Sequence, residues 1–280
     1  MKNAIFTCSD SKFGDFTINH WLKSLKDNVD LSNIDVIILD YGFTKDQISK
    51  LKEIGVIVVK CLRDGHVTSI RFRDIAKFLE KKQYDQVLLS DGGDIIFQDD
   101  LTNLFNDNKK EFRAVCEDYC AVDLRDLFIK GYFKKEDVEE IKRSLKGKRV
   151  INAGILVGPY DKFLKLCKDC YDLLARKDSF GPDQVAITYL LYKISFKELD
   201  EKYNYVILCA KNKFFIKDST FYLENGEKIP IVNNAGRFSA FRGIRNFGYG
   251  KDCNLTKKHY LNGVKLTYNV KKKMGITWNK

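Results

Sequence analysis

The stretch 87-VLLSDGGDIIFQDD-100 joins a short apolar run to an acidic turn that contains two glycines. Its first three residues have the length and composition of a strand buried on both faces of a parallel sheet. Four carboxylates follow within ten residues, and the glycines separate the first pair, Asp91 and Asp94. Ligands of open α/β sheets bind at the carboxyl ends of the strands. The stretch therefore predicts an α/β fold with a binding site in this turn.

The chain before this stretch alternates between strand-like and helix-like segments. Apolar runs at 3–8, 36–39 and 56–59 read as strands, and helical spacing is found at 16–25, 44–55 and 68–81. Thr44 is a suitable N-cap for the second helix, and Gly55 a suitable C-terminal stop. Such alternation implies a parallel sheet with right-handed crossovers.

The chain after this stretch is less regular. Strands are predicted at 113–116, 150–157, 206–208 and 231–232, and helices within 118–146 and over 160–174 and 182–192. Pro182 suits the first turn of its helix. Beyond Gly236 the chain is basic and aromatic without clear periodicity.

Composition favours a cytoplasmic protein. The 280 residues allow one large domain or a domain with an added lobe, and 44% are hydrophobic. No segment approaches the roughly 20 apolar residues that span a bilayer, and Asp10 ends an apolar run too short for a signal peptide. Eight cysteines fit this compartment as free thiols. The pair in 167-CKDC-170 lies in a predicted helix without a second ligand pair, which disfavours a metal or redox role.

The net charge of +11 fits three kinds of partner: nucleic acid, an anionic membrane, or anionic small substrates. Lysines cluster at 257–258 and 271–273, although Lys-rich tails are usually just solvated. The three histidines are scattered at 20, 66 and 259, which argues against a zinc site or a Ser-His-Asp triad. Neither a P-loop nor a Gly-x-Gly-x-x-Gly motif occurs.

The acidic turn has the chemistry of a divalent-cation site. Carboxylate oxygens suit Mg²⁺ and Mn²⁺, and glycines permit close approach of the backbone to a ligand. The alternative is a polar turn that caps the helix predicted from Leu101. We assign that capping role to Asp99 and Asp100, and expect Asp91 and Asp94 to bind the metal.

The turn resembles the Asp-x-Asp loop of GT-A glycosyltransferases, including those of glycosyltransferase family 8. Counted back from Asp100-Leu101, Asp94 aligns with the second acid of that loop. The first acid falls on Gly92, so Asp91 takes its place only if the loop is one residue longer.

Other family motifs follow in order over about residues 3–236. The stretch 152-NAGIL-156 resembles the Phe-Asn-Ala-Gly strand that lines the sugar site, and 181-GPDQ-184 resembles an Asp-Gln pair opening a helix. In 232-VNNAG-236, Asn233 replaces the His that is the third metal ligand. Arg71 resembles an Arg that supports the diphosphate.

The resemblance implies an α/β GT-A fold: a Rossmann-like, mostly parallel sheet flanked by helices, with an added acceptor-side lobe. We expect a nucleotide-sugar half at about 1–105, an acceptor half at about 106–236, and a basic aromatic segment at 237–280 that packs on or closes over the domain. The implied reaction moves a hexose from a nucleoside diphosphate sugar, expected to be a UDP-sugar, to a hydroxyl of a glycan, lipid-linked or protein acceptor. The implied cofactor is Mn²⁺ or Mg²⁺, and family 8 implies retention at the anomeric carbon.

The expected site residues fall into three groups. The catalytic group is Asp183, Gln184 and Asn152, the metal group is Asp91, Asp94 and Asn233, and the donor-binding group is Thr7, Ser9, Asp40, Arg71, Gly92, Gly93, Ala153, Gly154, Gly236 and Arg237.

Some of these residues have an alternative structural role. Asp183 also suits the dipole at a helix start. Thr7, Ser9 and Asp40 also suit ordinary strand-end hydrogen bonding. Arg71 and Arg73 are two residues apart, so only one is expected to face the phosphates.

Two other functions stay open. Asn233 in place of His fits a protein that kept the fold and lost catalysis. The basic and aromatic residues of 237–251 approach the pattern of a nucleic-acid-binding surface, but no known module accompanies them, so nucleic acid is not expected as a partner. That glycine-dense segment also suits a loop that closes over the diphosphate, and the lysines beyond it suit peripheral contact with the anionic inner face of a membrane.

Overall fold

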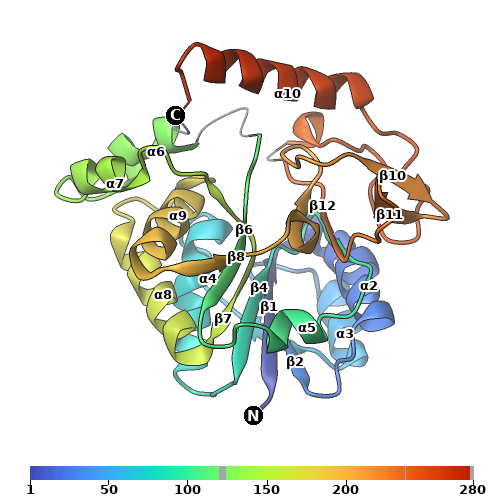
Figure 1. Ribbon diagram of the computed structural model, residues 1–280. Coiled ribbons are helices and arrows are strands. Elements are labelled where there is room, and N and C mark those ends of the chain that lie inside the picture. Colours follow the sequence, from blue (N-terminus) through green and yellow to red (C-terminus); the bar gives the residue numbers. More distant parts are fainter. Residues whose placement is uncertain (120–123, 237, 278–280) are drawn as a thin grey trace.

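A seven-stranded mixed sheet forms the centre of the molecule in this computed structural model, which describes residues 1–119, 124–236 and 238–277 (Figure 1). Its strand order is β3-β2-β1-β4-β7-β6-β8. The first four neighbours pair in parallel, β7 runs antiparallel to both β4 and β6, and β8 is parallel to β6. The strands are β1 (Asn3–Ser9), β2 (Ile34–Asp40), β3 (Ile57–Lys60), β4 (Gln86–Ser90), β6 (Phe112–Cys116), β7 (Ile151–Pro159) and β8 (Phe196–Glu198). The predicted mostly parallel α/β architecture is confirmed.

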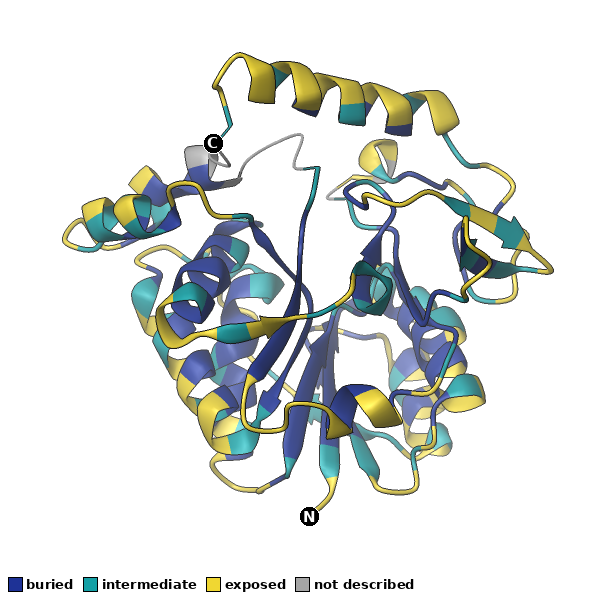
Figure 2. Cartoon of the chain, in the orientation of Figure 1, coloured by how far each residue is buried: buried dark blue, intermediate teal, exposed yellow. Residues whose placement is uncertain are grey.

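Helices cover both faces of this sheet (Figures 1 and 2). One face carries α4 (Val67–Leu79), α6 (Leu124–Tyr132), α7 (Val138–Leu145), α8 (Tyr160–Leu173) and α9 (Pro182–Ile194). The other carries α1 (Ser11–Phe16), a π-helix η1 (Thr17–Leu22), α2 (Lys23–Asn28), α3 (Lys45–Ile54) and α5 (Thr102–Asn106). Neighbouring strand residues alternate between these layers: Leu88 packs in the second and Leu89 in the first. Because β1, β4 and β7 are buried on both sides, they contain continuous apolar runs.

The helix ends show how local sequence sets these elements. The Thr44 side chain accepts a hydrogen bond from the Gln47 amide, and Gly55 ends α3 in the left-handed region at φ 84°, as predicted. The first helix begins at Ser11, earlier than expected, because the Asp10 side chain accepts from the amides of Lys12 and Phe13.

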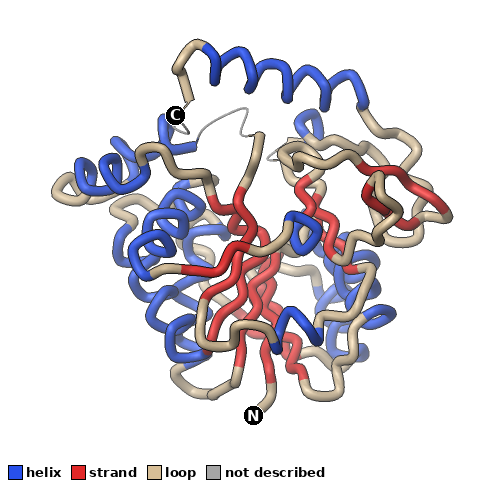
Figure 3. The backbone as a smooth tube through the Cα atoms, viewed as in Figure 1, coloured by secondary structure: helices blue, strands red, loops and turns tan. Residues whose placement is uncertain are grey.

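A smaller lobe lies beside the main sheet (Figures 1 and 3). It contains a three-stranded sheet, β5 (Ile95–Phe97), β12 (Ile231–Asn233) and β9 (Tyr205–Val206), and a hairpin, β10 (Phe214–Lys217) and β11 (Thr220–Leu223). Two short 3₁₀ helices, η2 (Glu201–Asn204) and η3 (Ser239–Phe241), belong to the same part of the chain. Since β4 belongs to the main sheet and β5 to the lobe, the acidic turn between them lies at the junction.

The helix α10 (Lys258–Lys273) crosses above the carboxyl edge of the main sheet (Figure 1). Leu261 joins the core of the lobe, and Tyr268 packs edge-to-face on Tyr119 at 5.5 Å between ring centroids. The sequence did not predict this helix, because Leu266 and Val270 are exposed on its outer side and blur the inner apolar stripe. Among the described residues, no helix is long and apolar enough to span a bilayer.

The seven described cysteines are free thiols, as expected. Cys167 and Cys170 belong to α8 and are fully buried in the core. Burial raises the pKa of Cys167, which fits an inert core thiol rather than a redox pair.

Candidate active site

The acidic turn and the 152–154 segment meet at the carboxyl edge of the sheet. Ser90, the last residue of β4, pairs with Ile155 of the antiparallel strand β7. The beginning of β7 therefore lies beside the end of β4, and the Asp91 amide donates to the Gly154 carbonyl at 3.0 Å. A Cβ on Gly154 would lie 2.6 Å from Asn233 Nδ2 and 2.8 Å from Asn152 Oδ1. Only glycine allows these side chains to approach so closely.

Arg71 links the acidic turn to α9. Its side chain is 1% exposed, and its guanidinium donates to Asp91 at 2.5 Å and to Asp183 at 3.3 Å. Burial alone would lower the pKa of Arg71, but the two carboxylates outweigh that effect and raise it. Arg73 instead pairs with Asp64 and Asp74, away from the site. Arg71 is thus the one of the two arginines that faces the site.

Asp94 lies deeper than Asp91. Its side chain is 15% exposed against 35% for Asp91, and its Oδ1 has no hydrogen-bond partner among the described residues. Burial, reinforced by the charge of Asp91, raises the pKa of Asp94 to about 7. The Nη2 atom of Arg242 lies 3.7 Å from Asp94 Oδ2, and its Nη1 donates to the Gly93 carbonyl at 3.2 Å.

A chain of buried amides runs from the metal group to the catalytic group. Asn233 Nδ2 donates to Asn204 Oδ1 at 3.0 Å, and Asn204 Nδ2 donates to Asn152 Oδ1 at 2.9 Å. Asn152 Nδ2 and Gln184 Nε2 then both donate to Glu117, at 2.7 and 3.0 Å.

The backbone fixes the orientation of this amide chain. The Gly154 N–H donates to Asn152 Oδ1 at 2.9 Å, so that atom must be the oxygen. Asn204 must then donate to it and accept from Asn233. Asn233 Oδ1 is therefore directed away from Asn204, and it is buried without a partner among the described residues.

The predicted metal group fits a divalent cation. Asp91 and Asp94 supply carboxylates, and no described group of three His, Cys, Asp or Glu side chains is placed to hold a metal. An amide oxygen can add a third protein ligand to these two carboxylates. Asn233 pairs with Ile95 across β12 and β5, next to Asp94, and its orphaned Oδ1 is such an oxygen. Two buried oxygens without partners would each be satisfied by a bound cation.

Two adjoining cavities meet at these residues. The larger, of about 280 Å³, extends over the end of β1, and the smaller, of about 70 Å³, extends toward the 152–154 segment and α9. They share six lining residues: Thr68, Arg71, Asp91, Asp94, Phe180 and Gly236. The charged residues Arg71, Asp91 and Asp94 thus stand where the two cavities join.

Comparison with solved structures identifies the fold. No protein-family model matches the sequence, and no curated protein matches it. Two crystal structures of the glycosyltransferase GlyE of Streptococcus pneumoniae TIGR4 are similar to this chain. The TM-score is 0.56 for the apo form and 0.54 for the second structure, and the sequence identity is 17% for both. The match covers 99% of this chain and 64% of the GlyE chain. The chain has a glycosyltransferase fold. At this identity the likeness concerns the fold, and this chain spans less than two thirds of GlyE's length.

Most predicted site residues of this glycosyltransferase fold line the two cavities. Ser9, Gly92 and Gly93 line the larger, Gly236 lines both, and the smaller is lined by Asn152, Ala153, Gly154, Asp183, Gln184 and Asn233. Arg237 lies outside the described residues.

Two predicted donor-binding residues line neither cavity. Thr7 is fully buried behind the acidic turn, with Oγ1 2.6 Å from the position of a Cβ on Gly92. Asp40 Oδ1 accepts from the amides of Gly42 and Phe43, both at 2.8 Å, so it holds its own turn. The alternative of strand-end hydrogen bonding therefore describes Asp40 better than a donor contact.

Sequence reasoning missed several residues of the site. Glu117 directly follows β6 and is 8% exposed, so the rule that identified Asp91 after β4 would also have found it. Asn204 had no such signal, because it lies in the short helix η2. The larger cavity is also lined by Asp10, Lys12, Phe13, Arg63 and His66, which follow β1 and β3.

Proposed function

We propose that this protein transfers a hexose from a nucleoside diphosphate sugar, with a UDP-sugar as the expected donor, to a hydroxyl group of an acceptor. One observation carries the proposal: Asp91 and Asp94 stand with Arg71 where two cavities join, and Asp94 Oδ1 and Asn233 Oδ1 are buried without described partners. A site that combines a buried arginine with unsatisfied oxygen atoms suits a diphosphate and the divalent metal ion that accompanies it. The glycosyltransferase fold supports the same reaction class.

The larger cavity is the place for the nucleotide. Its volume of about 280 Å³ lies just below the range of roughly 300–1,000 Å³ of ordinary ligand sites, so it suits part of a nucleotide-sugar. The Phe13 ring lies 5.6 Å from the Arg242 guanidinium and forms one wall. Lys12, Arg63 and Arg242 add positive charge around the diphosphate, beyond that of Arg71.

Asp91, Asp94 and Asn233 would hold Mn²⁺ or Mg²⁺. When bound, the cation supplies positive charge to the diphosphate leaving group. Arg71 holds Asp91 and Asp183 in place through its two ion pairs. Because Arg71 is buried, its charge acts on the site with little screening by water.

The smaller cavity is the place for the hexose. Asn152 and Gln184 are oriented by a common partner, Glu117, and Asp183 is oriented by Arg71. Burial raises the pKa of Asp183, and the charge of Arg71 opposes that shift. These side chains offer both donors and acceptors to sugar hydroxyls. The family resemblance supports retention at the anomeric carbon, with Asp183, Gln184 and Asn152 as the residues nearest the chemistry.

Release of UDP from a panel of UDP-hexoses in the presence of Mn²⁺ tests this function. Wild type should hydrolyse one donor slowly without an acceptor, and Asp94→Ala should not. Asp99→Ala is the matched control, because Asp99 is half-exposed in the same segment, lines neither cavity and should leave the rate unchanged. Binding without hydrolysis would favour a protein that kept the fold and lost catalysis. No binding of any nucleotide-sugar would overturn the proposal.

We propose a cytoplasmic location with peripheral contact to an anionic membrane through α10. Leu266, Val270 and Met274 are spaced four residues apart and are 66%, 47% and 67% exposed. Lys271, Lys272 and Lys273 adjoin this stripe, and each basic residue near an anionic surface contributes about 1 kcal/mol. Co-sedimentation with phosphatidylserine vesicles should be lost in Leu266→Asp/Val270→Asp. Undiminished sedimentation of that variant would show that the apolar stripe of α10 makes no such contact.

A further inference from the structure

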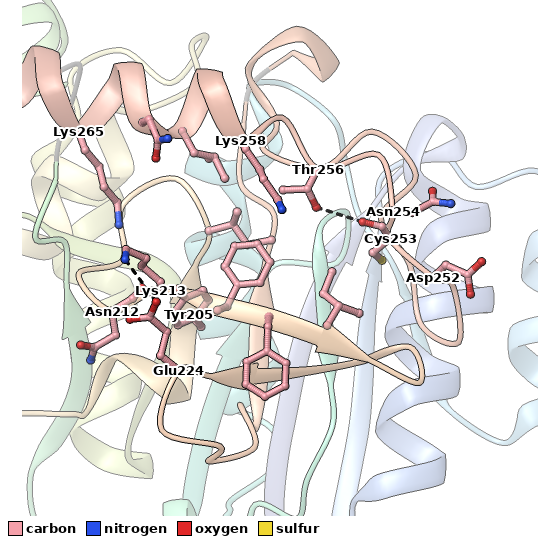
Figure 4. A pocket seen from close by; sticks show the side chains of 16 residues that line it. Tyr205, Asn212, Lys213, Glu224, Asp252, Cys253, Asn254, Thr256, Lys258 and Lys265 are labelled. Carbon is pink, nitrogen blue, oxygen red and sulfur yellow. Dashed lines mark hydrogen bonds and ion pairs between the residues drawn. The ribbon is translucent and has the colours of Figure 1, made fainter.

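A cavity of about 670 Å³ lies between α10 and the β10–β11 hairpin, and the proposed reaction does not use it (Figure 4). It is more than twice the volume of the nucleotide cavity and falls within the size range of ordinary ligand sites. The segment that follows Gly236 lines both cavities. Phe238 and Arg242 face the nucleotide cavity, whereas residues 252–254 and 256 face this one.

Aromatic rings held by their neighbours form the apolar part of this cavity. The Phe214 ring meets Tyr205 edge-to-face at 5.9 Å and Phe221 at 5.7 Å between centroids. Phe215 stacks on Tyr222 at 5.4 Å, yet it is still 42% exposed. Because Phe214 and Phe215 are neighbours in β10, their side chains point to opposite faces of the hairpin. Phe214, which packs with the core of the lobe, is the ring held toward the cavity.

Basic, acidic, amide and hydroxyl side chains surround these rings. Lys258, Asn262 and Lys265 share one side of α10 through their spacing of four and three residues. The opposite wall carries Asn212 and the ion pair of Lys213 with Glu224 at 3.3 Å. The remaining wall carries Asp252, Asn254 and Thr256 (Figure 4).

This lining discriminates among ligand classes. A phosphate or carboxylate would face the carboxylates of Glu224 and Asp252 as well as the lysines. A wholly apolar ligand would leave amides and charges desolvated without partners. A sugar chain satisfies both parts, because its hydroxyls donate to carboxylates and accept from ammonium groups, while its C–H faces pack on aromatic rings. We propose that this cavity binds a neutral oligosaccharide. If the proposed transfer is correct, this oligosaccharide is the part of the acceptor remote from the reacting hydroxyl.

The test begins with an array of immobilised neutral oligosaccharides of varied linkage, followed by titration of the best binder as a free trisaccharide. Phe214→Ala and Asn262→Ala each remove a lining group and should weaken binding at least about tenfold. Leu266→Ala is the matched control, because Leu266 belongs to the same helix but is 66% exposed and does not line the cavity. Circular dichroism should show that all three variants fold.

The titrations also separate this inference from the proposed transfer. Dodecyl phosphate serves as the competing probe, and it should bind more weakly than the best oligosaccharide. The inference is overturned if no oligosaccharide binds, if dodecyl phosphate binds more tightly, or if both lining variants bind like wild type. UDP release should be unchanged in Phe214→Ala and Asn262→Ala, because neither residue lines a donor cavity. Saccharide binding by a protein that hydrolyses no nucleotide-sugar would uphold this inference and count against the transfer alone.

Discussion

Arg71 and Arg113 are buried to the same degree, 1% and 0% exposed, but they have different surroundings. Arg71 faces the carboxylates of Asp91 and Asp183 at the edge of two cavities, and its pKa is raised. Arg113 donates to the carbonyls of Leu104 at 2.7 Å and Asp107 at 2.6 Å and to the Gln86 side chain, and burial lowers its pKa to about 10. Arg113 lines none of the cavities described above.

The comparison shows that burial alone does not mark a functional arginine. Carbonyl groups accept the hydrogen bonds of the Arg113 guanidinium, which borders none of these cavities. Arg113 therefore serves the fold. The carboxylates that face Arg71 border a cavity, so we expect Arg71 to act in ligand binding. Arg125 follows the structural pattern, since it is 1% exposed and donates to the carbonyls of Leu145 at 3.2 Å and Lys148 at 2.7 Å.

Removal of Arg71 should have the largest effect. Arg71→Met leaves Asp91 and Asp183 without their common partner, and breaking a buried ion pair costs about 3–5 kcal/mol of unfolding free energy. Donor binding should also be lost. Urea unfolding and titration with the UDP-hexose found by hydrolysis measure the two effects. Adding Asp183→Asn should restore part of the stability but not the donor binding, and wild-type donor affinity in Arg71→Met would contradict the comparison.

Removal of Arg113 should affect stability alone. Arg113→Met leaves Gln86 and the carbonyls of Leu104 and Asp107 unpaired in the core, at about 1–3 kcal/mol for each group left unsatisfied. The folded fraction should bind the donor with wild-type affinity, because Arg113 lines none of the three cavities. A loss of donor affinity in folded Arg113→Met would remove the distinction between the two arginines.

Asp94 should make the metal-free protein less stable as pH rises. Its pKa is raised from 3.8 to about 7 on folding, so the folded state binds the Asp94 proton more tightly than the unfolded state does. Stability is therefore lost as pH rises from about 4 to about 7. Asp94→Asn should remove this part of the slope, measured by urea unfolding in EDTA across that range. Parallel curves for the two proteins would mean that Asp94 titrates normally.

Asn233 should set metal preference more than affinity. An amide oxygen is a poorer ligand for Mn²⁺ than an imidazole nitrogen, so wild type should use Mg²⁺ nearly as well as Mn²⁺. Asn233→His should shift the ratio of UDP release toward Mn²⁺. The matched control is Asn234→His, because the Asn234 side chain bonds to the Ile244 backbone instead of facing the acidic turn. An unchanged ratio in Asn233→His would place Asn233 outside the coordination sphere.

Asp40 should show the smallest effect. Asp40→Ala removes two hydrogen bonds to turn amides, a loss comparable to that of a helix cap, about 1 kcal/mol. Donor affinity should not change, because Asp40 lines neither donor cavity. Weaker donor binding in Asp40→Ala, measured by the same titration, would support the nucleotide contact predicted from the position of Asp40 at a strand end.

Elements whose signals are local could be predicted from the sequence. The strands up to β4 are short apolar runs, and the N-cap at Thr44 and the stop at Gly55 lie within the segment that they delimit. The helix α10 could not be predicted, because its outer residues are apolar and its N-terminus has no side-chain cap. Periodicity reports a helix only when one face alone is apolar.

The alternating α/β pattern and the position of the acidic turn at a strand end follow from residues close together in the chain, so both could be predicted. Which polar groups meet at that turn depends on how distant strands pair. The antiparallel β7 brings Asn152 and Gly154 to the edge where β4 ends, and Arg242 reaches the Gly93 carbonyl across 149 residues of sequence. Glu117 and Asn204 join the same network for this reason. Contacts between distant residues depend on strand order and direction, and local apolar periodicity carries no information about either.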